Sequence, residues 1–232
     1  MNGYNFTSGC ELAALCKKHS APISEIMLRR QAELTEESRE HILDELSITL
    51  EAMRRSVTEG LTEELESVSG LSGGDAMLLN DRAGNALSGS IIAANASISG
   101  AEHGCQAETG SAAAMAAAAL CELDGGSPEK CLHAAAMALK NVMGLVCDPV
   151  AGLVECPCIK RNALGACNAL ICADMALAGI PSLIPFDETV SAMKSVGSLM
   201  SPDLRETARG GCAATPTGKA IRKQLGLSGE QD

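Results

Sequence analysis

Apolar residues recur at helical spacing in the first third of the chain. Between Thr35 and Gly60 the apolar positions follow one another at steps of three or four: Ile42, Leu46, Leu50, Met53 and Val57. This spacing places them in one stripe of an amphipathic helix. Thr35, followed by two glutamates, is a suitable N-cap, and Gly60 is a suitable stop. A shorter helix is predicted over 23–34.

The rest of the chain also predicts helices. Ser127–Pro128–Glu129 supplies a capping oxygen, a first-turn proline and an acid, so a helix is expected to run from there to about Gly144. Further helices are predicted over 162–178, from Asp187 and from Ser201. The alternation of apolar and polar residues that is typical of strands is nearly absent. The predicted fold class is therefore all-α.

Small residues make up much of the apolar content. Hydrophobic residues account for 46% of the 232 residues but aromatic residues for only 1%, and 111–120 reads SAAAMAAAAL. Helices packed on alanine and glycine can approach closely, which favours a compact helical body around a small buried site. We expect a single domain over 1–232, with N-terminal helices in 1–66 and a helical body in 67–232.

Charge and the N-terminal sequence exclude several protein classes. The net charge of −11 argues against nucleic-acid binding, which needs clustered Lys and Arg. The first residues, MNGYNFTSGC, do not form a secretory signal, and no apolar run approaches the length of a membrane span. The sequence thus predicts a cytoplasmic protein without a membrane segment.

The eleven cysteines are expected to be reduced in that compartment. They can then serve as small core residues, as metal ligands or as reactive thiols. Six of them sit among Ala, Leu and Ile at helix-like positions and are assigned to packing: Cys10, Cys16, Cys121, Cys131, Cys167 and Cys172.

Three other cysteines adjoin residues that break helices. Cys105 follows a glycine, Cys147 precedes Asp-Pro, and Cys158 follows a proline. Each is expected at a helix end or in a turn, where free N–H groups stabilise a thiolate. The C-x2-C pairs usual in zinc sites are absent, whereas an iron–sulfur cluster needs only three or four cysteines that converge in space. On residue types alone, structural cysteines and a metal site are equally supported.

The segment 67–79, SVSGLSGGDAMLL, is rich in glycine and serine. Backbone N–H groups at Gly73 and Gly74 could hold an anion such as a substrate carboxylate. The pattern alone favours a plain connector.

Four stretches resemble one known family. NASISGAEHGCQAE (95–108) and GLVCDPVAGLVECPCIKRNA (144–163) resemble the two signature segments of the iron–sulfur-dependent L-serine dehydratases, or L-serine ammonia-lyases. SGLSGGDA (69–76) and ETARGGCAATPTGKA (206–220) resemble further parts of the alpha, or catalytic, subunit. The resemblance extends from about Ile23 to Lys223.

The resemblance implies a 4Fe-4S cluster on Cys105, Cys147 and Cys158, with a helical domain built around a cluster-binding cleft. One iron would stay open and act as a Lewis acid on the β-hydroxyl of L-serine, giving pyruvate and ammonia without pyridoxal phosphate. The implied partner is a beta subunit or a second copy. The substrate-binding candidates are Ser97, Ser99, Gly73, Gly74, Lys160 and Asn162. The general base is not identified: His103 is interpreted as a second-shell or surface residue.

The sequence departs from the family near residues 89–93. Relatives carry a further glycine-rich block between segments equivalent to 87–89 and 96–102, which are joined almost directly here. Three interpretations follow: an impaired relative, a shortened gene product, or a site completed by another chain. A cysteine desulfidase and a cluster-binding relative without activity are the alternative functions. Cys156, where the family usually has valine, is unassigned, and Cys212 fits poorly as a further ligand.

Overall fold

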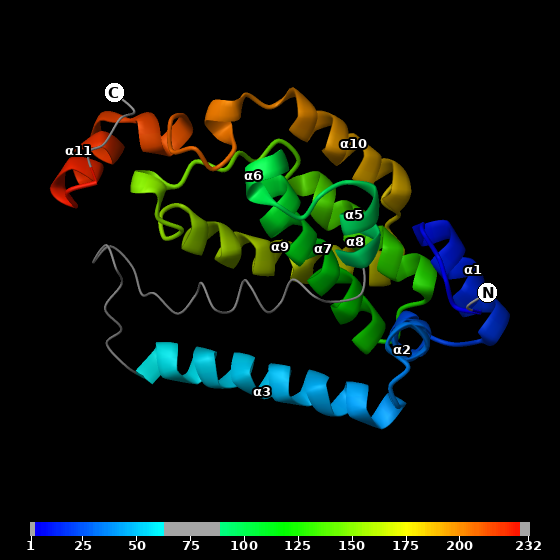
Figure 1. Ribbon diagram of the computed structural model, residues 1–232. Coiled ribbons are helices and arrows are strands. Elements are labelled where there is room, and N and C mark those ends of the chain that lie inside the picture. Colours follow the sequence, from blue (N-terminus) through cyan, green and yellow to red (C-terminus); the bar gives the residue numbers. More distant parts are fainter. Residues whose placement is uncertain (1–2, 63–88, 228–232) are drawn as a thin grey trace.

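The computed structural model describes residues 3–62 and 89–227, where the regular elements are helices (Figure 1). The α-helices are α1 (Gly9–His19), α2 (Ile23–Thr35), α3 (Arg39–Thr62), α5 (Gly89–Asn95), α6 (Gly100–His103), α7 (Cys105–Leu123), α8 (Pro128–Asn141), α9 (Cys158–Leu177), α10 (Phe186–Leu199) and α11 (Pro216–Gln224). Short 3-10 turns are η1 (Val150–Gly152), η2 (Pro202–Leu204) and η3 (Gly211–Ala214). Within these ranges the β-type pairing is limited to an isolated parallel bridge between Cys147 and Arg205. The all-α prediction is confirmed.

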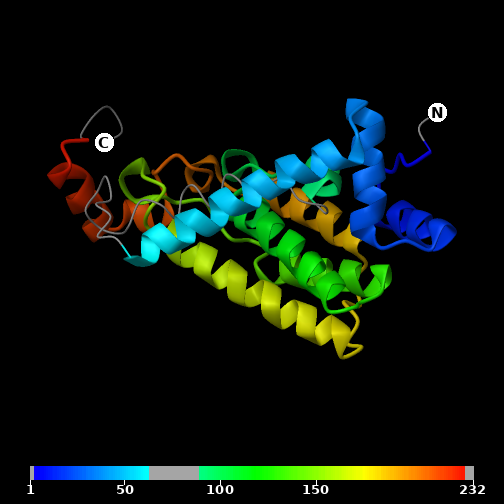
Figure 2. The ribbon, with the colours of Figure 1, turned by 90° about the horizontal axis from the view of Figure 1, so that it is seen from below.

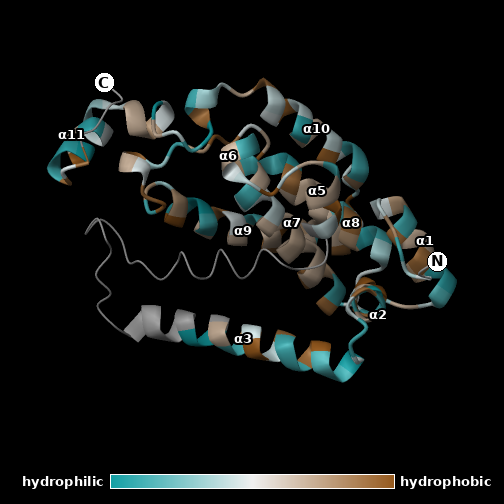
Figure 3. Ribbon diagram, in the orientation of Figure 1, coloured by the Kyte–Doolittle hydropathy of each residue, from teal (hydrophilic) through white to brown (hydrophobic). Residues whose placement is uncertain are grey.

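Helices α7, α8 and α9 pack against one another and form the centre of the molecule, and α10 lies against α8 (Figure 1). Alanines fill much of the contact, including Ala113, Ala114 and Ala117 of α7 and Ala134–Ala138 of α8. Gly165 of α9 lies so close to α7 that a Cβ there would sit 3.1 Å from Thr109 Cγ2. Hydrophobic residues gather on these central helices, whereas α11 is mostly hydrophilic (Figure 3). Small side chains thus allow the close helix packing expected from composition.

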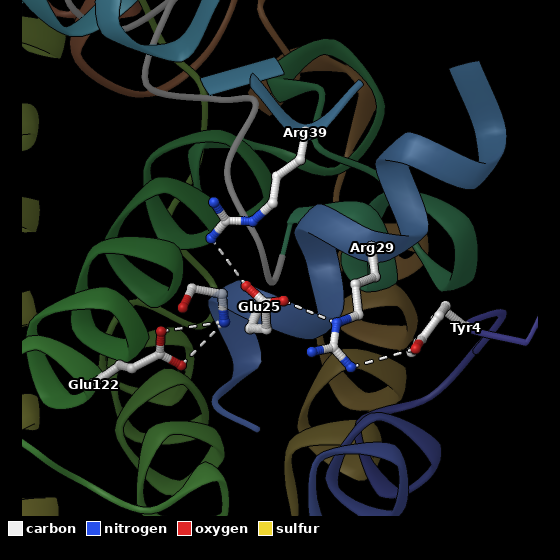
Figure 4. Close-up of polar contacts among 6 residues, drawn as sticks. Tyr4, Glu25, Arg29, Arg39 and Glu122 are labelled. Atoms are coloured by element: carbon white, nitrogen blue, oxygen red, sulfur yellow. Dashed lines mark hydrogen bonds and ion pairs between the residues drawn. The ribbon is translucent and has the colours of Figure 1, made fainter. Parts of the chain in front are cut away.

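Polar contacts around Glu25 join the N-terminal helices to the body (Figure 4). The Glu25 carboxylate accepts hydrogen bonds from Arg29 at 2.8 Å and from Arg39, the first residue of α3, at 3.2 Å. These bonds lower the pKa of Glu25. Glu122 of α7 accepts the Ser24 N–H at 3.1 Å. The beginning of α2 is thereby held on the end of α7, and α3 starts beside it.

The long N-terminal helix was predicted with the wrong cap. Thr35 is the last residue of α2, and Glu36 follows it in the left-handed region, at φ 58°. The Ser38 hydroxyl accepts the His41 N–H at 3.1 Å at the start of α3. The helix also continues past Gly60. The later serine takes the capping role because the backbone reverses at Glu36.

The apolar stripe of α3 is only partly buried. Ile42 is 5% exposed, but Leu46 and Leu50 are 57% and 58% exposed. The side chains of Met53 and Val57 lie outside the described part. Helix α3 runs along the outside of the helical body when the molecule is seen from below (Figure 2). The periodicity therefore identified the helix correctly but not how much of its apolar face is covered.

Helix boundaries in the body follow local capping. The Ser127 hydroxyl accepts the Lys130 N–H, so α8 starts as predicted. Helix α9 begins four residues earlier than predicted, at Cys158. Ser201 starts only the 3-10 turn η2 instead of the predicted helix. Helix α11 was missed, although Thr215 caps it by accepting the Gly218 N–H at 3.1 Å.

The predicted division of the chain at residues 66 and 67 falls outside the described residues, so the domain assignment stays a prediction. Helix α1 contacts α2, α8 and α10. Among the described residues, no helix has the combination of length and hydropathy that a bilayer crossing requires.

Candidate metal centre

The three cysteines beside helix-breaking residues lie at helix starts and in a loop, as their neighbours predicted. Cys105 is the first residue of α7, and Cys158 is the first residue of α9. Cys147 lies in the segment between α8 and α9. All three side chains are buried, with exposed fractions of 2%, 8% and 4% for Cys105, Cys158 and Cys147. A thiol at the first turn of a helix experiences the positive end of the helix dipole, which favours the thiolate.

The structure brings two of these sulfurs together. Cys105 Sγ, Cys147 Sγ and a carboxylate oxygen of Glu108 all lie within 4.8 Å of one another. Cys158 is not a member of this group, but the negative charges of Cys105 and Glu108 act on its thiol. Two of the three buried sulfurs are therefore in contact, and the third lies within electrostatic range of them.

The pKa values of the three thiols are moved in different directions. A hydrogen bond from Cys147 lowers the pKa of Cys105, against the effect of burial, and Arg161 adds to the lowering. The same hydrogen bond, together with burial, raises the pKa of Cys147. Burial raises the pKa of Cys158 to about 12. Cys105 is thus the sulfur whose anion is best stabilised, and Cys147 acts as its donor.

Two glycines make room for this arrangement. A Cβ on Gly100 would lie 2.8 Å from Glu108 Oε2 and 3.2 Å from Cys147 Sγ. Gly104, directly before Cys105, has φ 77°, and a Cβ there would lie 2.7 Å from the Leu145 carbonyl oxygen and from Met200 Sδ. Larger residues at either position would displace the sulfurs or the backbone that carries them.

The loop that carries Cys147 is held by backbone pairing to the C-terminal region. The Cys147 N–H donates to the Leu204 carbonyl at 2.8 Å, and the Glu206 N–H donates to the Cys147 carbonyl at 2.8 Å. These two bonds form the isolated bridge described above. A segment almost sixty residues later therefore fixes the position of the ligand candidate.

Gln106, next to Cys105, is fully buried and connects three segments. Its N–H donates to the Leu145 carbonyl at 2.9 Å, and its side-chain oxygen accepts the Gly144 N–H at 2.8 Å. Its side-chain amide donates to the Met193 carbonyl of α10 at 3.1 Å. These bonds satisfy the buried amide and fix the start of α7 against the Cys147 segment.

Sequence reasoning missed two charged residues of this site, Glu108 and Arg161. Each lies three positions after a cysteine that starts a helix, Cys105 for the first and Cys158 for the second. Residues three apart on a helix share a face. The spacing C-x-x-E and C-x-x-R was therefore a signal that could have identified both.

The substrate-binding candidates differ in burial. Ser97 is buried, and its hydroxyl accepts the N–H of Ser99, the residue that precedes α6, at 3.0 Å. Lys160 is exposed on α9 and Asn162 is half-buried. Gly73 and Gly74 lie outside the described residues. The structure thus describes four of the six candidate positions, and of these four only Ser97 is buried.

His103 lies at the end of α6 and packs against α10, since a Cβ on Gly197 would run into its ring. Its Nδ1 atom is buried and lacks a hydrogen-bond partner. The residue as a whole is half-buried, and its interpretation as a second-shell or surface residue stays a prediction.

The packing assignment of the six remaining cysteines is correct for four. Cys16, Cys121, Cys131 and Cys172 are buried. Cys10 and Cys167 are exposed, so packing is wrong for these two. Cys10 lies beside Asp187 of α10 at the surface, and Cys167 is exposed on α9, neither of which a local apolar neighbourhood in the sequence reveals.

The donor set fits an iron–sulfur cluster. The three buried thiols come from separate segments, none is in a disulfide, and one is stabilised as a thiolate. Thiolates from dispersed positions are the usual cluster ligands, and hydrogen bonds to their sulfurs tune the cluster. A helix start, a guanidinium and a carboxylate surround the sulfurs here.

Comparison with known proteins covers the region of this site. The family model described as "Serine dehydratase alpha chain" matches residues 83–213, which is more than half of the chain and includes all three cysteines. The chain belongs to the serine dehydratase alpha chain family. The resemblance stated from the two signature segments is thereby confirmed.

Relatives of this family match the chain over different lengths. A "Probable L-serine dehydratase, alpha chain" from Bacillus subtilis (strain 168) is 41% identical over 281 residues, covering 93% of each chain. A protein with the same description from Latilactobacillus sakei is 58% identical over 137 residues, covering 59% of this chain and 66% of the relative. The "L-serine dehydratase, alpha chain" of Peptoniphilus asaccharolyticus is 56% identical over 142 residues, covering 61% and 49%.

The Bacillus subtilis alignment bears on the block that the chain is predicted to lack near residues 89–93. Its 281 aligned positions exceed the 232 residues of this chain by 49, so at least that many positions of the relative have no counterpart here. This supports the absence of a block from the chain. Its placement near residues 89–93 stays a prediction.

Proposed function

We propose that this chain is the catalytic alpha subunit of an iron–sulfur-dependent L-serine ammonia-lyase, which converts L-serine to pyruvate and ammonia. The observation that carries the proposal is the group of Cys105 Sγ, Cys147 Sγ and the Glu108 carboxylate within 4.8 Å, with buried Cys158 nearby. This group lies inside the family match, and relatives that are 50–56% identical over part of the chain are named L-serine dehydratases.

Cys105, Cys147 and Cys158 would hold a 4Fe-4S cluster. The cluster would supply a Lewis acid that assists departure of the serine β-hydroxyl group. A base removes the α-proton as the hydroxyl group leaves with a proton as water, and the aminoacrylate so formed tautomerises to an imine, which takes up water and releases ammonia. Loss of one water and uptake of one water therefore leave pyruvate and ammonia as the products.

The chain's own residues prepare the site in three ways. The start of α7 and the Arg161 guanidinium favour a negative charge at Cys105 Sγ. Burial of all three sulfurs excludes bulk water from them. The Glu108 carboxylate places an oxygen beside two of the sulfurs, where it can accept a proton.

Substrate contacts and assembly belong to the same proposal. Ser97 and Ser99, with Gly73, Gly74, Lys160 and Asn162, are the proposed substrate-binding residues, and the partner is a beta subunit or a second copy. The whole chain is proposed as one catalytic domain, with the cluster in the body that starts near residue 67.

The test is an anaerobic assay of the reconstituted chain with L-serine and with L-cysteine, in the presence and absence of the partner subunit. Pyruvate and ammonia from L-serine are expected. Sulfide released from L-cysteine in preference would instead identify a desulfidase. A full cluster without turnover of either amino acid would overturn the lyase proposal.

That last outcome has its own supporting observation. Because at least 49 positions of the Bacillus subtilis relative lack a counterpart, part of a substrate site could be missing from this chain. A cluster-binding protein without activity is therefore the second candidate. Sequencing the transcript across residues 85–100 would establish whether the junction is real.

A further inference from the structure

Arg161 contacts three partners around the sulfurs with one nitrogen. Its Nη1 atom lies 2.7 Å from Asp148 Oδ1, donates to the Val146 carbonyl at 2.7 Å and lies 3.7 Å from Cys105 Sγ. The side chain is only 14% exposed, and that of Asp148 is 2% exposed. A buried carboxylate and a buried guanidinium that contact each other in this way depend on each other for charge compensation.

Asp148 also reaches the C-terminal region. Its Oδ2 atom accepts the Cys212 N–H at 2.6 Å, and the Cys212 thiol is hydrogen-bonded to the same side chain. Cys212 belongs to the turn η3, which contacts η1. One carboxylate therefore connects the Cys147 loop, helix α9 and the turn that leads into α11.

We propose that Arg161, oriented by Asp148, is a positioning residue that holds a positive charge beside the sulfur of Cys105. Together, Arg161 and Asp148 also fasten the η3 turn to the cysteine group. The activity proposed above uses only the charge of Arg161 beside Cys105 Sγ; the orientation of Arg161 by Asp148 and the link to the η3 turn go beyond it. The part concerning charge rests on the proposed cluster, whereas the part concerning the turn does not.

The arrangement has two separable consequences. A positive charge beside a ligand sulfur stabilises the more negative, reduced form of a cluster, so its removal should lower the midpoint potential. Loss of the Asp148 contact should also free the η3 turn. A lysine at position 161 would keep the charge, but its ammonium is a point charge on a flexible stem and would not be held where the planar guanidinium places Nη1.

The first experiment uses the apo chain and needs no cluster. Trypsin cleavage after exposed Arg209, two residues before η3, is followed by mass spectrometry in wild type, Arg161→Gln and Asp148→Asn. The matched control is Arg29→Gln, which removes a different arginine from an ion pair, on α2, far along the chain from the sulfurs. Both test variants should be cleaved severalfold faster, and the control at the wild-type rate. Equal rates in all four proteins would overturn the fastening role.

The second experiment uses the anaerobically reconstituted chain. The midpoint potential of the cluster and its rate of bleaching in air are measured for Arg161→Gln, Arg161→Lys and the Arg29→Gln control. Arg161→Gln should lower the potential and bleach severalfold faster, and Arg161→Lys should lie between it and wild type. Should Arg161→Gln fail to fold, as circular dichroism would show, Arg161→Lys carries the test.

The outcomes separate the two proposals. An unchanged potential and bleaching rate in both Arg161 variants would contradict the charge role even if the enzyme is active. Wild-type protein that takes up no iron would contradict the proposed function, while the cleavage experiment still decides whether Arg161 and Asp148 hold the turn.

Discussion

The positions of the site's residues depend partly on their sequence neighbours and partly on tertiary contacts. Cys105 and Cys158 start helices because Gly104 and Pro157 precede them, and this was readable from the sequence. The approach of Gly100 to Cys147 was not, since it joins α6 to a loop more than forty residues later. A glycine or proline directly before a cysteine thus marks a ligand candidate in the sequence, whereas the space around its sulfur is set by tertiary contacts.

Replacing Gly100 by alanine tests that room. The added Cβ would lie 2.8 Å from Glu108 Oε2 and 3.2 Å from Cys147 Sγ, so one of them must move. We expect reduced iron content after anaerobic reconstitution, with the helical circular dichroism retained. Gly3→Ala is the control, because its Cβ would meet Glu33 at an ordinary 3.8 Å. Wild-type iron content in Gly100→Ala would show that the sulfurs tolerate the shift.

Thiol reactivity is a second prediction at this scale. In the native apo chain near neutral pH, iodoacetamide should label exposed Cys10 and Cys167 before buried Cys16 and Cys131. Burial raises the pKa of Cys16 to about 11, so its thiol stays protonated and unreactive until the pH approaches that value. Mass spectrometry of the peptides gives the order. Early labelling of Cys131 without unfolding would contradict the described packing.

Helical elements were predictable where the capping residue is local. Ser127-Pro and Thr215-Pro both mark real helix starts, although the second was not used. The coverage of α3 was not predictable, because exposure of Leu46 and Leu50 depends on what lies beside the helix. Propensity and spacing define an element, but only the assembled molecule decides which face is buried.

Removing the cap of α8 should weaken the fold measurably. Ser127→Ala deletes the hydroxyl that accepts the Lys130 N–H and should lower the free energy of unfolding by about 1 kcal/mol. Urea denaturation followed by circular dichroism measures the change. Ser195→Ala, an exposed position inside α10, should change it by less than about 0.5 kcal/mol. Equal effects of the two substitutions would argue against the cap.

The whole molecule is organised by the close packing of α7, α8 and α9. Composition predicted this style of packing, since alanine and glycine are abundant and aromatic residues are rare. Which helices pack against α7 could not be predicted from the sequence, because buried residues lie around most of the circumference of α7 and do not form a single apolar stripe. Cys105 and Cys158 lie at the starts of α7 and α9, and Cys147 lies in the segment between α8 and α9, so the geometry of the three depends on that packing.

Leu139 tests the central packing. It is fully buried in α8, and a Cβ on Gly110 of α7 would lie 3.2 Å from its Cδ1. Leu139→Ala should lower the free energy of unfolding by about 2–5 kcal/mol through lost burial and a cavity. Leu199, at 85% exposure, is the matched control and should change stability little on substitution by alanine. A small loss at Leu139 in urea denaturation would mean that α7 and α8 are less tightly joined than described.

The central claim is that Cys105, Cys147 and Cys158 hold one cluster, and iron with acid-labile sulfide per chain after anaerobic reconstitution tests it most directly. Wild type, Cys121→Ser and Cys172→Ser should each hold roughly four of both, as a cubane cluster requires. Each of Cys105→Ser, Cys147→Ser and Cys158→Ser should lose most of them. Full iron and sulfide in these three variants, or their loss in Cys121→Ser and Cys172→Ser, would contradict the account.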